Sequence, residues 1–177
     1  LKHPIGSESL EALIRRKQRE KPSPTAVIVV SDNTRPVPYI GEQGILEPVF
    51  DVLNFCGVKE IEILVATGTH RILKENELRK FLPERVFDGR IRVRNHDGTD
   101  KASLSFVGHT SRKTEVWINK HYLEADIKIL TGLVEPHFMA GFSGGRKAVC
   151  PGVVGEAVTH TFHGAAFMAH EKCASLI

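Results

Sequence analysis

The chain has 177 residues, a length that suits one domain with its own hydrophobic core. Its apolar fraction of 41%, charged fraction of 25% and formal charge of +3 are ordinary for a soluble globular protein and do not indicate a nucleic-acid partner. No apolar run approaches the ~20 residues that span a bilayer, and no secretory segment is evident, so we expect no membrane partner and a cytoplasmic location. Cys56, Cys150 and Cys173 form no CxxC pair, which favours a reducing compartment over a disulfide framework.

The hydrophobic pattern predicts short buried strands that alternate with helices. The run AVIVVS at 26–31 is β-branched and continuous, as is typical of a strand buried on both faces of a parallel sheet. In chain order we predict a helix over 8–21, a strand over 26–31, a helix over 45–56 closed by Gly57, a strand over 60–66, a short helix over 75–81, strands over 91–94 and 125–131, and a helix over 156–173. The pattern over 104–117 is weak and predicts only short strands. The alternation predicts an α/β fold, with a Rossmann-like, mostly parallel sheet flanked by helices.

Three polar loops follow the carboxyl ends of predicted strands. They contain Asp32, Thr67 and Glu135, directly or shortly after the strand ends. Ligands of open parallel sheets bind outside the carboxyl ends of the strands. We therefore expect the three loops to converge on one crevice.

The third loop, EPHFMAGFSGGRKAVCPG at 135–152, is the most distinctive stretch of the chain. Gly141, Gly144 and Gly145 allow sharp turns and a close approach of the backbone to a ligand. Lys147, two residues beyond the last of these glycines, is placed to meet an anion or a covalently held cofactor, and partial burial would make its amine nucleophilic. The alternative is an ordinary surface lysine.

The first two loops offer an anion-binding group and a proton-transfer group. Arg35, fixed before a proline, presents a planar fork that suits a carboxylate or phosphate, whereas Asp32 also suits an ordinary turn. His70 and His137 come from separate loops, and such a pair could act as general acid and base on opposite sides of a substrate. For each histidine the alternative is a solvated loop side chain.

Two further patterns in the last third of the chain carry weaker signals. GFSGG matches the GxSxG nucleophile pattern with Ser143, but about ten loop residues separate that serine from the preceding strand. The stretch fails as a P-loop, because Arg146 stands where the motif needs glycine. His160, His163 and His170 share the last predicted helix, and HxxH on a helix can bind a metal, although no companion ligand is evident.

Four stretches, SDNTRPVP, LVATGTHR, NHDGTD and EPHFMAGFSGGRKAVCPG, together resemble the family of nickel-pincer-nucleotide lactate racemases. The resemblance implies that Asp32 and Arg35 border the substrate, with Arg35 gripping its carboxylate. It implies that His70 and His137 are the two catalytic acid/base residues. It also implies that Lys147 carries the cofactor, a nickel pyridinium-3,5-bisthiocarboxylic acid mononucleotide, through a thioamide bond.

The same resemblance implies further contacts and a reaction. The cofactor-binding residues that it implies, besides Lys147, are Thr34, Ser143, Gly144 and Gly145. A downstream histidine completes the nickel coordination, and spacing favours His163, with His160 left open. The implied reaction inverts the C2 centre of a 2-hydroxy acid, such as lactate, by reversible hydride transfer to the cofactor through a keto acid.

Members of the family are longer than this chain. We therefore expect residues 1–177 to form a single α/β domain that corresponds to most of the family's N-terminal domain, with the C-terminal domain outside this chain. We expect a small-molecule 2-hydroxy acid as the partner and leave a homo-oligomer open. Two alternatives remain, a serine hydrolase that uses Ser143 and a non-catalytic module that binds a carboxylate or phosphate.

Overall fold

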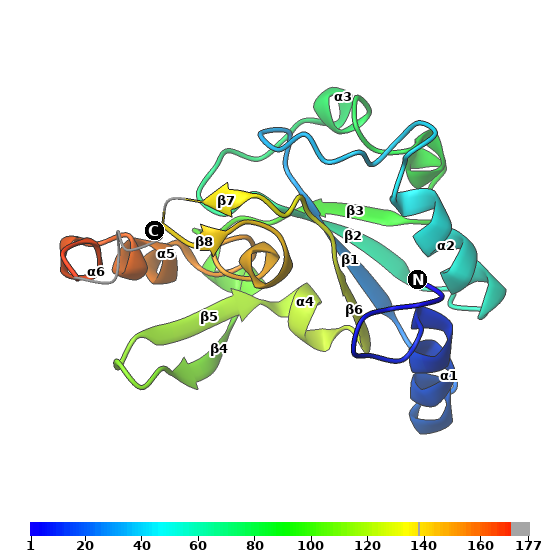
Figure 1. The fold of residues 1–177 in the computed structure, drawn as a ribbon, viewed down its shortest axis with the longest axis horizontal. Helices are drawn as coiled ribbons and strands as arrows, with labels where there is room; N and C mark the ends of the chain where they lie inside the picture. Colours follow the sequence, from blue (N-terminus) through cyan, green and yellow to red (C-terminus); the bar gives the residue numbers. More distant parts are fainter. Residues whose placement is uncertain (138, 171–177) are drawn as a thin grey trace.

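A four-stranded parallel sheet forms the centre of the molecule in a computed structural model that describes residues 1–137 and 139–170 (Figure 1). The spatial order is β3-β2-β1-β6, with bounds Arg92–Asn95, Ile61–Ala66, Ala26–Ser31 and Ile127–Leu130. All three neighbouring pairs run parallel. The predicted α/β fold with helices on a parallel sheet is confirmed.

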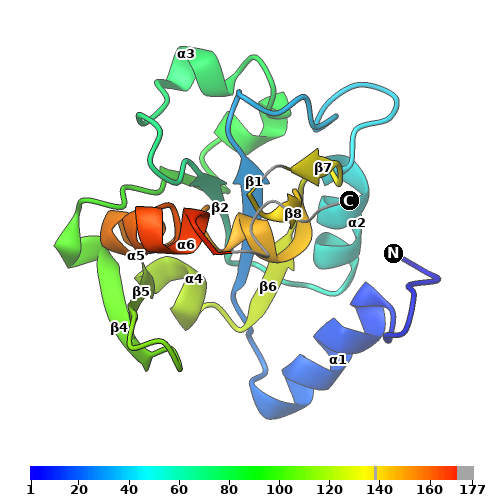
Figure 2. The same ribbon diagram turned by 60° about the vertical axis from the view of Figure 1, so that its left-hand side comes forward.

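Both faces of the sheet are covered, which explains the unbroken apolar run of β1. Ile28 and Val30 point into a large core that includes residues of α1 (Leu10–Glu20) and α2 (Leu46–Phe55). Val27 and Val29 point into a smaller core on the opposite face, beside α4 (Lys120–Glu124). Figure 2 shows α1 and α2 on one side of the sheet and α4 with the α5 segment on the other. A strand between two cores has no solvent face, so polar alternation is lost.

Local signals set the ends of the first two helices. The Ser9 hydroxyl oxygen accepts the Ala12 N–H at 3.2 Å and caps α1. Beyond α2, Gly57 has φ +75°, and the Gly57 and Val58 N–H groups donate to backbone carbonyls of the last helical turn, at 2.9 Å (Asn54) and 3.0 Å (Leu53). This Schellman pattern needs a left-handed residue, so the glycine predicted to close the helix does so.

The later elements differ more from the prediction. Residues 104–119 form an antiparallel hairpin of β4 (Leu104–His109) and β5 (Glu115–Asn119), whose strands are mostly half-buried or exposed. Partial burial on both faces gives the weak pattern seen there. The α3 helix (Glu75–Leu78) ends earlier than predicted. Short 3-10 turns, none of them predicted, lie at η1 (Glu84–Phe87), η2 (Lys101–Ser103) and η3 (Gly145–Ala148).

The single helix predicted over 156–173 is wrong. The chain forms α5 (Glu156–Phe162) and α6 (Ala165–Met168), and Gly164 between them is extended, with φ −72° and ψ 160°. Glycine is among the least favourable residues in the interior of a helix, so the helix breaks there. Ala169 and His170 are not helical, and the last part of that prediction, residues 171–173 with Cys173, lies outside the described residues. Within the described part of the chain, no helix is long and apolar enough to cross a membrane.

A hydroxyl relay ties the carboxyl ends of β1 and β6 to the first polar loop. The Thr131 hydroxyl donates to the Val29 carbonyl at 2.7 Å, so the Tyr39 hydroxyl donates to Thr131 Oγ1, 3.1 Å away. The Tyr39 oxygen in turn accepts the Ser31 N–H at 2.6 Å. Tyr39 is buried, and its relay fixes the loop that carries Asp32 and Arg35.

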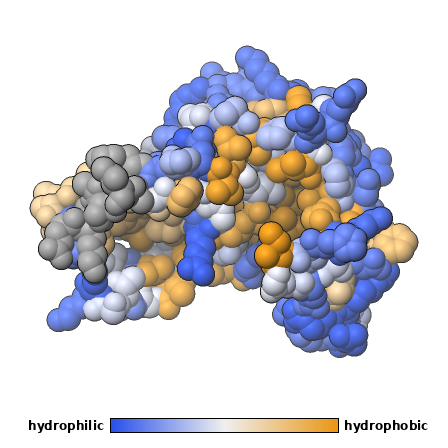
Figure 3. All heavy atoms as spheres, in the orientation of Figure 1, coloured by the Kyte–Doolittle hydropathy of each residue, from blue (hydrophilic) through white to orange (hydrophobic). Residues whose placement is uncertain are grey.

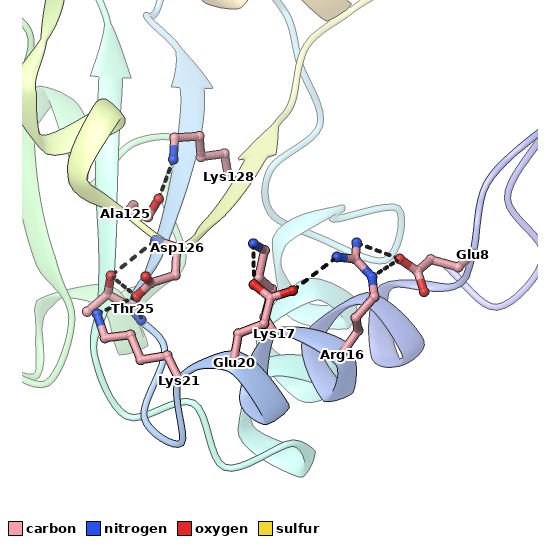
Figure 4. Close-up of polar contacts among 9 residues, drawn as sticks. All are labelled: Glu8, Arg16, Lys17, Glu20, Lys21, Thr25, Ala125, Asp126 and Lys128. Atoms are coloured by element: carbon pink, nitrogen blue, oxygen red, sulfur yellow. Dashed lines mark hydrogen bonds and ion pairs between the residues drawn. The ribbon is translucent and has the colours of Figure 1, made fainter.

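A cluster of polar side chains lies at the opposite edge of the sheet (Figure 4). Asp126 Oδ2 accepts the Thr25 N–H at 2.8 Å and hydroxyl at 3.0 Å, and lies 2.7 Å from Lys21 Nζ. The hydrogen bond from Lys21, helped by the Thr25 N–H, lowers the pKa of Asp126 to about 2. Charged groups at this edge join the entry to β1 to the entry to β6.

Candidate functional site

The three polar loops converge on one cavity of about 300 Å³ at the carboxyl edge of the sheet. The predicted site residues that line it are Asp32, Thr34, Arg35, His70, His137, Ser143, Gly144, Lys147 and His163. Gly145 is not among the lining residues. The expected crevice therefore exists, and it gathers side chains from the ends of β1, β2 and β6 and from α5.

His70 is backed by a buried carboxylate. Its Nδ1 lies 2.6 Å from Oδ2 of Asp32, which is only 4% exposed. The other carboxylate oxygen accepts the Thr34 N–H at 3.1 Å and hydroxyl at 2.5 Å. Because a carboxylate can only accept, His70 Nδ1 carries a proton and Nε2 of the neutral ring holds a lone pair.

The His70 loop is also attached to the glycine-rich loop. The Gly68 N–H donates to the Gly152 carbonyl at 3.0 Å, and Gly68 has φ +59°. The His70 N–H then closes a turn on the Thr67 carbonyl at 2.9 Å. A left-handed glycine thus lets the end of β2 turn toward the cavity.

His137 is held by the backbone instead. It ends β7 (Pro136–His137), which pairs with β8 (Gly141–Phe142), and its Nδ1 accepts the N–H groups of Met139 and Ala140, both at 3.2 Å. Backbone N–H groups can only donate, so Nδ1 carries the lone pair and Nε2 of the neutral ring carries the proton. Burial, and then the nearby charges of Lys147 and Arg35, lower the pKa of His137 and keep it neutral near pH 7.

Lys147 reaches the cavity from the η3 turn. The turn is entered through Gly144, at φ +73°, where a Cβ would come within 2.9 Å of the Val134 side chain and 3.1 Å of the Leu133 carbonyl oxygen. Burial, and then the positive charge of Arg35, lower the pKa of Lys147. A depressed pKa increases the fraction of neutral, nucleophilic amine.

Arg35 forms an ion pair that the sequence did not predict. Its Nη1 lies 2.9 Å from Glu135 Oε1, and both side chains are 37% exposed. A pair this exposed contributes little to stability. It uses one nitrogen of the guanidinium group and leaves other N–H donors for a ligand carboxylate. Glu135 could have been found from its place in the same loop as His137.

The structure separates the two histidines that the sequence left open. His163 caps the end of α5 and lines the cavity, and its pKa is lowered by burial and then by Lys147 and His160. His160 is exposed and is not among the lining residues, and its Nε2 lies 3.4 Å from Glu156 Oε1. Across residues 1–137 and 139–170, no group of three or more His, Cys, Asp and Glu side chains could hold a metal ion.

Ser143 makes structural hydrogen bonds. Its Oγ donates to the Leu133 carbonyl at 2.6 Å and accepts the Glu135 N–H at 3.1 Å. No histidine in the described part of the chain hydrogen-bonds to it, and it follows a two-residue strand in a hairpin. The arrangement that a serine nucleophile requires is not assembled here.

The NHDGTD stretch positions α5. His96 is fully buried, with Nε2 2.8 Å from the Val154 carbonyl and Nδ1 3.2 Å from the Asn119 amide nitrogen. Burial lowers the pKa of His96, so its ring is neutral and can accept one bond while donating the other. The Glu156 N–H, at the start of α5, donates to the Gly98 carbonyl at 2.9 Å. These contacts fix the helix that delivers His163.

Apolar side chains are exposed close to this polar site. On the face drawn in Figure 3, hydrophobic residues are visible over the middle of the molecule and hydrophilic residues cover much of its edge. Val134 and Phe142, on either side of the β7–β8 turn, are 72% and 61% exposed.

Sequence reasoning also missed Thr159, which is buried in the cavity wall one turn before His163.

The carboxyl edge of a parallel α/β sheet thus gathers Arg35, Lys147 and two differently supported imidazoles around one cavity, the place where ligands of such sheets bind. Comparison with known proteins gives the family. Residues 1–175 match the model of the lactate racemase N-terminal domain, and the chain belongs to that family.

Two curated relatives are similar over most of the chain. The lactate racemase of Lactiplantibacillus plantarum is 36% identical over 174 residues, which cover 97% of this chain and 38% of the relative. The lactate racemase of Thermoanaerobacterium thermosaccharolyticum is 36% identical over 155 residues, or 86% of this chain and 34% of the relative. The chain thus spans little more than a third of the length of these relatives.

Two solved structures share the fold. The lactate racemase apoprotein from T. thermosaccharolyticum superposes with a TM-score of 0.86 at 30% identity, covering 98% of this chain and 40% of that one. A protein from Thermotoga maritima superposes with a TM-score of 0.69 at 29% identity, covering 89% of this chain and 40% of that one.

Proposed function

We propose that this chain is the part of a lactate racemase-like isomerase that carries its acid/base histidines, its substrate-binding arginine and its cofactor-binding lysine. The observation that supports this most is that Arg35, His70, His137 and Lys147 line one cavity in a member of the family. The substrate would be lactate or a related 2-hydroxy acid. Residues 1–177 would act as one domain, completed by the C-terminal domain of the whole protein.

The residues at the cavity fit a nickel-pincer nucleotide. A metal held by protein side chains alone needs several ligands, whereas a metal embedded in an organic cofactor needs few from the protein. His163 offers one neutral imidazole, which suits nickel, and Lys147 offers an amine with a lowered pKa for covalent attachment. When bound, the cofactor would supply the acceptor for the hydride on the substrate's Cα.

Arg35 would orient the substrate. Its guanidinium group binds a carboxylate through paired N–H donors, and the Glu135 contact occupies only one of its nitrogens. Lys147 lies in the η3 turn of the glycine-rich loop, and His163 lies at the end of α5. Substrate and cofactor would therefore be held by different elements. Fixing both reactants in this way lowers the entropy cost of the reaction.

The two histidines would transfer the hydroxyl proton. His70 Nε2, with its lone pair, can accept the proton of the substrate's C2 hydroxyl as a planar keto acid forms. His137 Nε2 carries a proton and can donate a hydrogen bond to the same oxygen. To transfer a proton to that oxygen when the other enantiomer forms, His137 would first take up a proton at Nδ1, so that a neutral imidazole and not an anion is left. In the reverse direction His137 would accept the proton at Nε2 and His70 would return one. Asp32, bound to His70 Nδ1, would then act by positioning that ring, rather than by touching the substrate.

Intact-mass and nickel analysis of the protein, co-expressed with the enzymes that make the cofactor, tests this proposal. We expect a covalent adduct and bound nickel in the wild type, and neither in Lys147→Met. Lys128→Met is the matched control, because burial also lowers the pKa of that lysine, but Lys128 does not line the cavity.

Normal nickel loading of Lys147→Met would show that the assignment is wrong. Labelling of Ser143 by a fluorophosphonate would support a hydrolase instead. A protein that binds lactate or phosphate through Arg35, with no adduct and no turnover, would be a carboxylate- or phosphate-binding module.

A further inference from the structure

Four buried hydroxyl side chains lie in the cavity wall, on Thr67, Thr131, Ser143 and Thr159. The first three each donate to a backbone carbonyl oxygen, at 2.5 Å (His96), 2.7 Å (Val29) and 2.6 Å (Leu133). Thr159 is 1% exposed, and its Oγ1 is the buried side-chain oxygen without a hydrogen-bond partner among the described residues. Buried polar groups are nearly always paired, so this hydroxyl requires an explanation.

The helix itself offers a partner that Thr159 does not use. A helical threonine can donate to the carbonyl four residues earlier, and Thr161 does so, to Ala157 at 2.9 Å. The equivalent acceptor for Thr159 is the Gly155 carbonyl, and no such bond forms. Leaving a buried hydroxyl unpaired lowers stability, which suggests that a bound molecule supplies its partner.

The position of Thr159 indicates which molecule. The His163 N–H donates to the Thr159 carbonyl at 3.0 Å, so the two residues lie one helical turn apart on the same face of α5. Both line the cavity, together with Lys147. The positive charge of Arg35 reaches Lys147, so this part of the cavity favours an anionic ligand, and an anionic oxygen is a strong acceptor for a hydroxyl proton.

We infer that Thr159 is a cofactor-binding residue, whose hydroxyl donates a hydrogen bond to an anionic oxygen of the molecule held by Lys147 and His163. The inference rests on the proposed function. Thr159 belongs to the helix of His163, whereas the substrate carboxylate would lie at the Arg35 loop, so the hydroxyl serves the cofactor rather than the 2-hydroxy acid.

The variant Thr159→Val tests the inference, because it keeps the shape of the side chain and removes the hydroxyl. In the cofactor-free protein, we expect its melting temperature to equal or exceed that of the wild type, since no hydrogen bond is lost. In the protein co-expressed with the cofactor's biosynthetic enzymes, we expect nickel to be lost about 10-fold faster during dialysis against a chelator, as for one hydrogen bond to a charged group.

Two variants are controls. Thr159→Ser keeps the hydroxyl and should retain nickel as the wild type does. Thr161→Val removes an exposed hydroxyl from the same helix; it should retain nickel and, because it breaks a bond that is made, should not raise the melting temperature.

The remaining outcomes would each overturn the inference. A Thr159→Val protein that fails to fold, or melts well below the wild type, would show that the hydroxyl has a structural partner. Unchanged nickel retention would overturn the inference while the proposed function stands. A raised KM for lactate with unchanged nickel retention would assign the hydroxyl to the substrate. A wild type with neither adduct nor nickel would overturn the proposed function and this inference together.

Discussion

Two regions present histidines to the cavity, and they support the ring in opposite ways. In the loop after β2, Nδ1 of His70 donates to the Asp32 carboxylate. In the β7–β8 hairpin, Nδ1 of His137 accepts two backbone N–H groups. The neutral rings therefore turn different faces to a ligand, one with a lone pair on Nε2 and one with a proton.

A single residue type can therefore present a hydrogen-bond acceptor and a hydrogen-bond donor to the same cavity. The second partner of each imidazole, and not the imidazole itself, decides which form faces the cavity. The two N–H groups at His137 Nδ1 oppose protonation of that nitrogen. The two regions should accordingly respond differently to substitution.

The largest expected effect follows removal of either ring. His70→Ala and His137→Ala should each lower kcat for racemisation by about 10²- to 10⁴-fold, the range for loss of a general acid or base. The Lys147 adduct and nickel content should be unchanged. Chiral analysis of lactate and intact-mass measurement would check both points. His160→Ala is the control, because that histidine does not line the cavity. If one variant kept wild-type turnover, a single base would suffice.

A smaller loss should follow a change in the support of His70 alone. Asp32→Asn replaces an obligate acceptor with an amide that can donate, so His70 can adopt the wrong tautomer, and we expect kcat to fall about 100-fold, the range for loss of a group that orients a functional histidine, with little change in KM. Steady-state kinetics would separate the two parameters.

Asp97→Asn provides a matched control for that change. Asp97 accepts the Thr99 N–H at 2.9 Å and hydroxyl at 2.7 Å, as Asp32 does with Thr34, but it does not line the cavity. If Asp32→Asn raised KM alone, Asp32 would contact the substrate directly, and the proposal that Asp32 orients the His70 ring would be wrong.

The smallest expected effect concerns the charge around His137. Arg35→Gln removes a positive charge that opposes protonation, so the pKa of His137 should rise, and the pKa of Lys147 should rise with it. Burial is the larger cause for both groups, so neither pKa should return fully to its ordinary value. NMR titration of the His137 ring would measure the change, with the exposed Arg146→Gln as control. A fall in the pKa of His137 would contradict this account.

Much of the fold could be predicted from residue patterns. The run AVIVVS specifies a strand with two buried faces, and Gly57 specifies the end of a helix, because both depend on local backbone and side-chain properties. The hairpin at 104–119 was not clear, because its strands are only partly buried and so lack a strong period. The break at Gly164 was missed, because the polar and apolar pattern continues through it.

The sequence by itself determined the parallel α/β architecture, the three loops at the carboxyl ends of the strands, and the residue types in them, because buried strand runs and the polar loops that follow them are local patterns. Only the tertiary structure decided the partners: Asp32 with His70, Glu135 with Arg35, His163 rather than His160 at the cavity, and the unpaired hydroxyl of Thr159. These contacts join segments as many as 100 residues apart. No local pattern encodes such distances, because they depend on how the whole sheet brings its loops together.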